Sequence, residues 1–259
     1  MKVVILCGGL GTRLREETEF RPKPMVNIGE RPILWHIMKT YAHYGHREFV
    51  LSTGYKGDLI KEYFYHYELM NNDVTLELSS PDKLQFHRRR GGEPWTVTLA
   101  DTGVDTLKGA RLKRVEQYIP DDEFMLTYGD GVADIDINRL VAFHRQHGKL
   151  ATVTGISPAS RFGELKIQGD HVESFTEKPK VGSGLINGGF FIFKKEIFNY
   201  LTVDKTCDLE VGALELLAHD HQLMVYRHDG FWACMDTIRD MEYLNRLWED
   251  GKAAWKVWL

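Results

Sequence analysis

The 259-residue sequence is poor in several features that would direct it to particular classes of protein. Its three cysteines, Cys7, Cys207 and Cys234, are an odd number without C-x-x-C spacing, which indicates neither a disulfide framework nor a structural zinc site. No apolar run approaches the length of a membrane span. The formal net charge of -4 argues against non-specific nucleic-acid binding. We therefore expect a cytoplasmic protein with reduced thiols that binds neither membranes nor nucleic acid.

The sequence also lacks low-complexity segments, internal repeats and recognisable linkers. Met1 and Lys2 lead directly into an apolar run from Val3 to Cys7, so we expect no signal peptide. Hydrophobic residues make up 43% of the chain and charged residues 27%, which is ordinary for a globular protein. We predict a single domain over residues 1–259.

Hydrophobic periodicity predicts an α/β fold. Strand and helix patterns alternate along the first half of the chain, which favours parallel strands joined by right-handed crossovers. A turn at 168–170 separates two short strand patterns and favours a hairpin, so the sheet should be mixed. The expected strands are 3–7, 49–51, 73–78, 96–100, 123–128, 151–156, 164–167, 171–176 and 186–193; the expected helices begin at Pro32 and Gly57 or lie at 110–119, near 141–144, at 209–219 and at 237–249, with a loop or excursion over 79–95.

A glycine-rich loop follows the first expected strand. Gly8, Gly9 and Gly11 allow the backbone N–H groups to approach an anion closely, and Arg13 adds a cation beside them. Leu14 stands where the dinucleotide-binding fingerprint requires its third glycine, and G-x-x-x-x-G-K-[ST] is absent from the chain. The loop therefore predicts a phosphate site of another kind.

The loop and a second motif together resemble the signature of the sugar-nucleotide pyrophosphorylases, which join a nucleoside triphosphate to a sugar 1-phosphate. The matching residues are Gly8-Gly9-Leu10-Gly11-Thr12-Arg13 and Pro22-Lys23-Pro24-Met25. Over nearly the whole chain, longer stretches resemble the glucose-1-phosphate cytidylyltransferases; these are 32–39, 93–99, 101–103, 111–114, 230–232 and 235–237. The chain departs from that pattern at Cys7, Glu30 and Thr106, and Thr106 keeps the hydroxyl of the expected serine.

The resemblance implies a Rossmann-like mixed, mainly parallel sheet flanked by helices, with an added C-terminal portion. The nucleotide-binding part would cover about 1–150, and the sugar-binding and C-terminal part about 151–259. It also implies a homo-oligomer that makes CDP-glucose from CTP and α-D-glucose 1-phosphate, with CDP-glucose serving as a precursor of deoxy sugars in bacterial surface polysaccharides such as the lipopolysaccharide O-antigen.

Such a reaction is an in-line attack of the sugar phosphate on the α-phosphorus, and it requires backbone donors, fixed cations and carboxylates for a divalent metal. The resemblance places Arg13 at the triphosphate and Lys23 at the reacting phosphates, although each alone would be an ordinary surface charge. It places Asp130 and Asp236 on Mg²⁺. Asp236 is free for this role because Thr237 and Asp240 offer a capping box to the following helix.

The remaining expected contacts fall into two sets. Arg111, predicted near the start of a helix, is a candidate donor to the acceptor edge of cytosine, and backbone groups of the glycine loop could bind its amino group. We expect the basic run from His87 to Arg90 to be a solvated cluster. The expected nucleotide contacts are Leu6, Cys7, Gly8, Gly9, Leu10, Gly11, Thr12, Arg13, Thr106, Arg111 and Gly129, and the expected sugar-phosphate contacts are Lys23, Glu177, Lys178, Asn187 and Gly188.

Residue spacing alone supports only nucleotidyl transfer to a sugar phosphate; cytosine and glucose rest on the resemblance. Two alternatives stay open: a uridylyl-, thymidylyl- or guanylyltransferase of the same fold, and a nucleotide-sugar sensor without turnover. The presence of Asp130, Asp236 and Arg13 argues against the sensor, because a pure binder needs no set of charges for a transition state.

Overall fold

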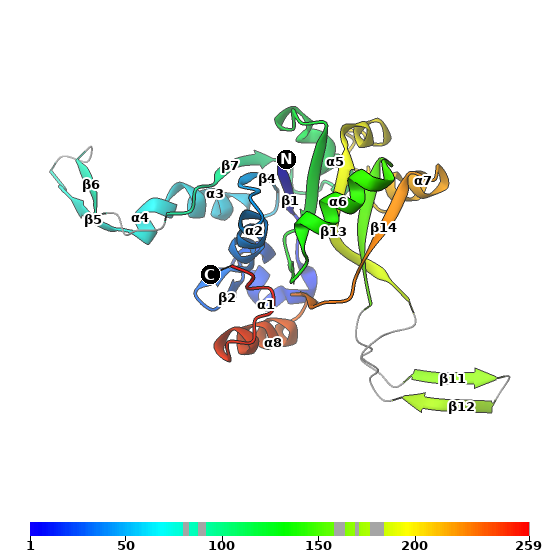
Figure 1. Cartoon of the computed structure of the whole chain (residues 1–259). Helices are drawn as coiled ribbons and strands as arrows, with labels where there is room; N and C mark the ends of the chain where they lie inside the picture. Colours follow the sequence, from blue (N-terminus) through cyan, green and yellow to red (C-terminus); the bar gives the residue numbers. More distant parts are fainter. Residues whose placement is uncertain (80–82, 88–91, 158–163, 169–170, 177–183, 259) are drawn as a thin grey trace.

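The computed structural model describes residues 1–79, 83–87, 92–157, 164–168, 171–176 and 184–258 (Figure 1). Two expected sugar-phosphate contacts, Glu177 and Lys178, lie outside the described residues, as do the three arginines of the basic run at 88–90. No helix within the described ranges is long and apolar enough to cross a membrane.

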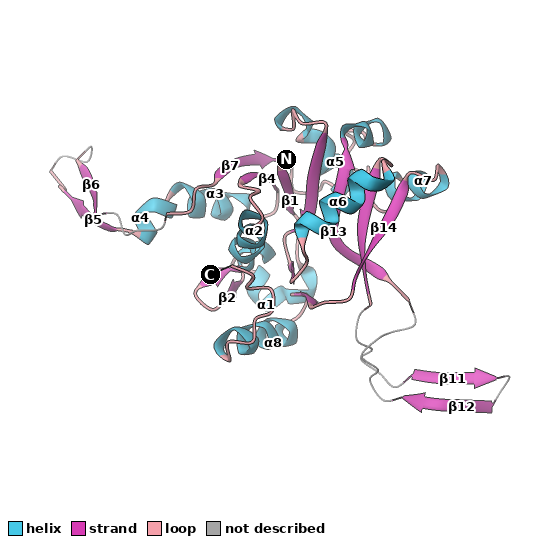
Figure 2. Cartoon of the chain, in the orientation of Figure 1, coloured by secondary structure: helices cyan, strands magenta, loops and turns pink. Residues whose placement is uncertain are grey.

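A seven-stranded sheet in the order β14-β10-β13-β8-β1-β4-β7 organises the fold (Figure 2). Neighbouring strands are parallel except at β13, which runs antiparallel to both β8 and β10. The mixed, mainly parallel sheet predicted from the sequence is therefore confirmed. The strands are β1 (Val3–Cys7), β4 (Glu48–Thr53), β7 (Thr96–Asp101), β8 (Glu123–Tyr128), β10 (Ala151–Ile156), β13 (Ile186–Lys194) and β14 (Leu223–His228).

Helices cover both faces of the sheet, and β1 is therefore buried on both sides. Val3, Ile5 and Cys7 pack in one core with residues of α2, α6 and α8, whereas Val4 and Leu6 pack in a second core with α5 and α7. The helices are α1 (Arg15–Thr18), α2 (Ile33–His43), α3 (Gly57–Tyr65), α4 (Tyr67–Asn71), α5 (Lys108–Arg114), α6 (Ile137–His147), α7 (Ala213–His219) and α8 (Ile238–Glu249), with 3-10 turns η1 (Thr12–Leu14), η2 (Lys23–Met25), η3 (Glu116–Tyr118) and η4 (Lys195–Tyr200).

Four two-stranded pairs complete the described structure. The hairpin expected at 164–176 is present as β11 and β12, and the excursion expected at 79–95 contains β6, which pairs with β5 and extends away from the sheet beyond α4 (Figure 1). The pair β9–β15 is important for the site described below. The pairs are β2 (Asn27–Ile28) with β3 (Arg31–Pro32), β5 (Asp73–Leu76) with β6 (Leu84–His87), β9 (Gly131–Ala133) with β15 (Trp232–Cys234), and β11 (Glu164–Gln168) with β12 (His171–Thr176).

Two predicted helices have different bounds in the structure. The helix expected at 110–119 begins earlier, at Lys108, and its last part is the separate turn η3. The helix expected at 209–219 begins only at Ala213. Before it, Asp208 Oδ1 accepts hydrogen bonds from the backbone N–H groups of Glu210 (2.9 Å) and Val211 (3.0 Å), which holds this segment in a turn.

His36 joins α2 to the C-terminal portion. Its side chain is fully buried, Nε2 lies 3.0 Å from the carbonyl oxygen of Ile28, and Trp255 Nε1 donates to Nδ1 at 3.4 Å. A ring that donates through Nε2 and accepts through Nδ1 must be neutral. Burial lowers the pKa of His36 to about 4, which agrees with that neutral form.

Acidification should therefore destabilise the protein through His36. The unfolded ring has a pKa near 6.5 and binds a proton before the folded one does, so stability is complete above about pH 6.5 and falls toward pH 4, by up to about 3 kcal/mol. Urea unfolding between neutral pH and about pH 4.5 measures this dependence. The variant His36→Gln should show a shallower pH slope; an unchanged slope would contradict the assignment.

Candidate functional site

A cleft of about 550 Å³ opens at the carboxyl ends of β1 and β8. Ligands of open α/β sheets bind at this edge. Within the described part of the chain, every expected site residue lines the cleft except Leu10, whose side chain is about half exposed in the same loop. The lining residues include Leu6, Cys7, Gly8, Gly9, Gly11, Thr12, Arg13, Lys23, Thr106, Arg111, Gly129, Asp130, Asn187, Gly188 and Asp236.

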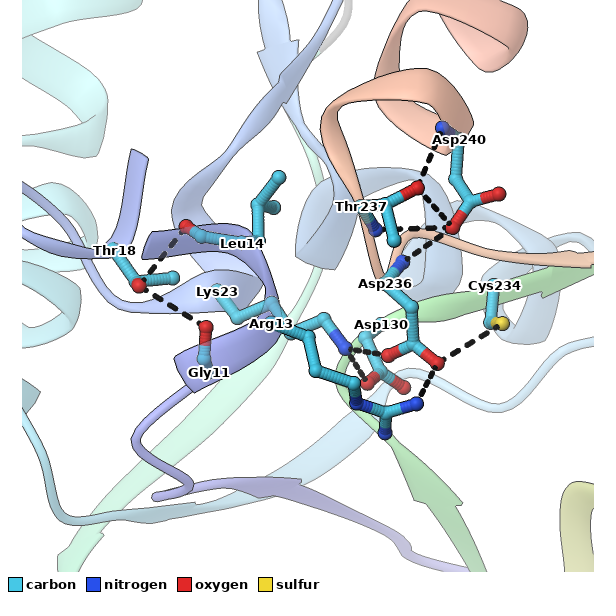
Figure 3. Close-up of polar contacts among 10 residues, drawn as sticks. All are labelled: Gly11, Arg13, Leu14, Thr18, Lys23, Asp130, Cys234, Asp236, Thr237 and Asp240. Atoms are coloured by element: carbon cyan, nitrogen blue, oxygen red, sulfur yellow. Dashed lines mark hydrogen bonds and ion pairs between the residues drawn. The ribbon is translucent and has the colours of Figure 1, made fainter. Parts of the chain in front are cut away.

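The glycine loop is shaped by close contacts. Gly11 has a φ of 64°, and a Cβ there would lie 2.7 Å from Thr18 Cγ2. The Thr18 hydroxyl, at the end of α1, shares its hydrogen between the carbonyl oxygens of Gly11 (3.1 Å) and Leu14 (3.0 Å), which holds the loop and η1 against α1 (Figure 3). The next turn carries Arg13, whose side chain is 74% exposed. The loop is thus fixed, while the side chain of Arg13 remains largely accessible to a ligand in the cleft.

Lys23 brings together two carboxylates that are far apart in the sequence. Its Nζ lies 2.6 Å from Asp130 Oδ2 and also contacts Asp236 Oδ1. Arg13 Nη1 reaches the other oxygen of Asp236 at 2.7 Å (Figure 3). Lys23 itself is 9% exposed and lies in η2, directly after Pro22. All four expected charged groups therefore meet at one point of the cleft.

The pairing of β9 with β15 explains this meeting. Asp130 directly precedes β9 and Asp236 follows β15, and in the antiparallel register Gly131 lies opposite Cys234. The backbone N–H of Met235 donates to the carbonyl oxygen of Asp130 at 2.8 Å, which extends the pair to the two aspartates. The expected capping box of α8 is also present.

In that box, Thr237 Oγ1 accepts from the N–H of Asp240 (3.3 Å), and the Asp240 carboxylate accepts from the N–H of Thr237 (3.0 Å). The first turn of α8 is thus capped by Thr237 and Asp240. The side chain of Asp236 is left for Lys23, Arg13 and the cleft.

The surroundings of Lys23 and Asp236 favour the charged forms of these two side chains. Burial would lower the pKa of Lys23, but the charges and hydrogen bonds of Asp130 and Asp236 raise it above its ordinary value. Burial likewise opposes ionisation of Asp236, yet Lys23 and Arg13 hold its pKa below the usual range. Burial and the two carboxylates raise the pKa of the nearby Cys234 thiol to about 12, so this cysteine is no thiolate nucleophile at neutral pH.

The donor set fits magnesium. Mg²⁺ prefers oxygen ligands and is usually held by one or two carboxylates together with substrate phosphates and water. Asp130 and Asp236 provide two such carboxylates on one side of the cleft. Among the described residues, no group of three or more histidine, cysteine, aspartate or glutamate side chains forms a complete metal cage. The remaining ligands would therefore come from phosphate and water.

Arg111 lies near the start of α5, as its fourth residue, and it is buried, with 3% of its surface exposed. Its guanidinium ties the glycine loop to segments after β4 and β7. The acceptors are the carbonyl oxygens of Gly8 (2.9 Å), Thr53 (3.2 Å), Gly103 (2.7 Å) and Val104 (2.9 Å) and the hydroxyl of Thr102 (2.8 Å).

The wall around Asn187 contains side chains that sequence reasoning missed. Tyr128 Oη accepts a hydrogen bond from Asn187 Nδ2 at 3.0 Å, and Trp232 Nε1 donates to the carbonyl oxygen of Gly188 at 2.8 Å. Lys108 also lines the cleft. Only their positions in the sequence could have identified two of these residues as part of the site. Tyr128 ends β8 directly before Gly129 and Asp130, and Trp232 begins β15.

Comparison with known proteins places this cleft in context. The family model described as nucleotidyl transferase matches residues 2–251. Glucose-1-phosphate cytidylyltransferases of Salmonella typhi and Salmonella typhimurium are each 52% identical to the chain over 259 residues, covering 100% of both sequences. A structure of UDP-glucose pyrophosphorylase from Acinetobacter baumanii superposes with a TM-score of 0.67 at 18% identity, covering 94% of this chain and 91% of that one. That structural likeness concerns the fold alone.

Proposed function

The chain belongs to the nucleotidyl transferase family, and we propose that it transfers a cytidylyl group from CTP to α-D-glucose 1-phosphate, giving CDP-glucose and pyrophosphate. The observation that carries this proposal is end-to-end identity of 52% with proteins named for that reaction. The cleft supports it, because Arg13, Lys23 and two aspartates gather there as a reaction between anions requires.

The proposal extends to cofactor and setting. Mg²⁺ is the proposed cofactor, with Asp130 and Asp236 as its protein ligands. The protein is proposed to act in the cytoplasm as a homo-oligomer and to supply CDP-glucose for deoxy sugars of a bacterial surface polysaccharide. Support for these points comes from the sequence motifs and, for the metal, from the paired carboxylates of the cleft.

Each charged group of the cleft has a separate role in the proposed reaction. Bound Mg²⁺ would neutralise phosphate oxygens and so help the α-phosphorus accept a nucleophile. Backbone N–H groups of the glycine loop and the exposed guanidinium of Arg13 hold the triphosphate. Lys23 neutralises charge at the reacting phosphates. The sugar phosphate attacks as an anion, so the protein needs no side chain to remove a proton from it.

Arg111 should contribute to cytidine binding through the loop that it holds. Arg111→Ala removes the partner of five acceptors, so we expect the free energy of unfolding to fall by about 3 kcal/mol. A loosened glycine loop should raise KM for CTP by at least about 10-fold, far more than KM for glucose 1-phosphate. Urea unfolding and initial rates measure the two effects.

Base reading by the Arg111 side chain itself has a separate signature. If the guanidinium also contacts the base, Arg111→Ala should reduce the preference for CTP over UTP. Arg111→Lys should not restore the wild-type values, since lysine lacks the planar fork. Unchanged discrimination between CTP and UTP would assign base reading to other groups and leave Arg111 as the residue that holds the loop.

Pyrophosphate release from each of CTP, UTP, dTTP, ATP and GTP with glucose 1-phosphate tests the proposed function. We expect rapid release with CTP only. Faster release with UTP, dTTP or GTP would reassign the nucleotide within the same reaction. Tight binding of CDP-glucose without release from any triphosphate would support the sensor instead.

A further inference from the structure

Four side chains form a series of hydrogen bonds that runs from the wall of the cleft to a residue behind it. Tyr128 Oη donates to Glu210 Oε1 at 2.5 Å and accepts from Asn187 Nδ2 at 3.0 Å. Lys108 Nζ contacts the same carboxylate oxygen and lies 5.3 Å from the centre of the Tyr128 ring. Lys108, Tyr128 and Asn187 line the cleft, whereas Glu210 is not among its lining residues.

The direction of each hydrogen bond follows from its partners. An ionised carboxylate can only accept, so the single hydroxyl hydrogen of Tyr128 points to Glu210. The Tyr128 oxygen then has only acceptor capacity left and must face an N–H of Asn187. A backbone N–H can only donate, so the Asn187 atom that lies 2.9 Å from the N–H of Gly189 is Oδ1. The amide orientation is fixed at both ends.

Between Tyr128 and Asn187, which form the end of these hydrogen bonds nearest the cleft opening at Gly188, one polar hydrogen remains without a partner among the four side chains. The Nδ2 group of Asn187 carries two hydrogens, and one of them is bound by Tyr128. The side chain of Asn187 is exposed at the cleft, next to Gly188, whose carbonyl is held by Trp232. The second hydrogen is therefore available to a ligand in the cleft.

Glu210 is itself held in place. The turn capped by Asp208 fixes its backbone, and Lys108 offsets its charge. The contacts of Glu210 with Lys108 and Tyr128 are both made through Oε1. The other oxygen, Oε2, is buried and has no hydrogen-bond partner among the described residues. A carboxylate that is mostly enclosed and bonded to a residue of the cleft wall determines the hydrogen-bond direction of its neighbours.

We propose that Glu210 and Tyr128 are positioning residues for the sugar: they hold the Asn187 amide so that its free Nδ2 hydrogen donates to a hydroxyl of the sugar phosphate. This inference rests on the proposed function and adds to it a determinant of sugar selectivity. Glu210 acts through Tyr128, and Tyr128 acts through Asn187, while neither needs to touch the reacting phosphates.

Steady-state kinetics with CTP and either glucose 1-phosphate or its monodeoxy analogues test this inference. Tyr128→Phe removes only a hydroxyl, and Glu210→Gln removes the charge at nearly constant volume. Each should raise KM for glucose 1-phosphate by about 10-fold while KM for CTP stays within about twofold. Wild type should react at least about 10-fold more slowly with the analogue that lacks the contacted hydroxyl, and both variants should lose most of that discrimination.

Two further variants separate positioning from general structural damage. Asn187→Ala should reproduce the loss of discrimination, and adding Tyr128→Phe to it should cause little further change, because both act on one contact. Tyr65→Phe, on the exposed face of α3, and Glu215→Gln, exposed on α7, are the matched controls and should behave as wild type.

The outcomes distinguish a failure of this inference from a failure of the proposed function. If wild type turns over but folded Tyr128→Phe and Glu210→Gln keep its sugar KM and its discrimination, the inference is wrong while the proposed function stands. An equal rise of both KM values, or additive effects with Asn187→Ala, would also overturn it. Absence of turnover by wild type with any nucleotide would instead overturn the proposed function. If Tyr128→Phe does not fold, Glu210→Gln provides the same comparison.

Discussion

Asp236→Asn should lower kcat for CDP-glucose formation by at least about 10³-fold. The substitution keeps the shape of the side chain but removes one of the two carboxylates proposed to hold Mg²⁺, and loss of metal-based charge stabilisation is worth several kcal/mol at the transition state. Lys23 remains paired with Asp130, so the variant should still fold. Initial rates over a range of Mg²⁺ concentrations measure the effect, and Asp130→Asn should behave similarly.

The surface variant Asp250→Asn is the matched control, because Asp250 pairs only with exposed Lys252 among the ion pairs of the described residues. It should retain wild-type rates. Binding of Mn²⁺ in the presence of CTP, followed by electron paramagnetic resonance, gives a readout independent of turnover and should weaken in both cleft variants. Full activity of Asp236→Asn at limiting Mg²⁺ would remove this residue from the metal site.

Lys23→Met should lower kcat by about 10²–10³-fold, the usual loss for one preorganised group at developing charge. Lys23 is the most enclosed cation of the cleft after Arg111, and its ammonium meets both aspartates. Its removal leaves two carboxylates facing each other without their shared cation, so it should also disturb their ionisation. Because the charge is needed at the reacting phosphates, kcat should fall more than KM rises.

Lys83→Met is the control for this change, since Lys83 is exposed and pairs with Glu77 on a hairpin outside the cleft. Lys23→Arg should recover part of the loss, because it restores the charge without the compact shape of an ammonium. A variant that loses affinity for substrate but keeps kcat would show that Lys23 only binds the ground state.

Much of the fold and part of the site could be predicted from the sequence. Val3 to Cys7 is a short β-branched run that is followed by glycines, and it is indeed a buried interior strand of the sheet from which the glycine loop leaves. Strand and helix order also predicted the parallel pairs of the first half. These features are local, so they are visible in a single sequence.

Features that depend on pairing between distant segments could not be predicted. Nothing local in Ile186–Lys194 indicates that β13 inserts antiparallel between β8 and β10. Leu209 to Gly212 continues a helical pattern, yet Asp208 holds it as a turn and so places Glu210 against Tyr128. Arg111 was expected near a base, but its burial among five acceptors depends on loops from three parts of the chain.

Phosphorus NMR of CTP and glucose 1-phosphate labelled with a heavy oxygen isotope in its phosphate tests the central claim most directly. With the protein and Mg²⁺, attack of the sugar phosphate on the α-phosphorus predicts unlabelled pyrophosphate and CDP-glucose that keeps the label, including at the oxygen bridging its two phosphorus atoms. Label in the released pyrophosphate, or an unchanged mixture under conditions in which the protein is folded, would contradict the account.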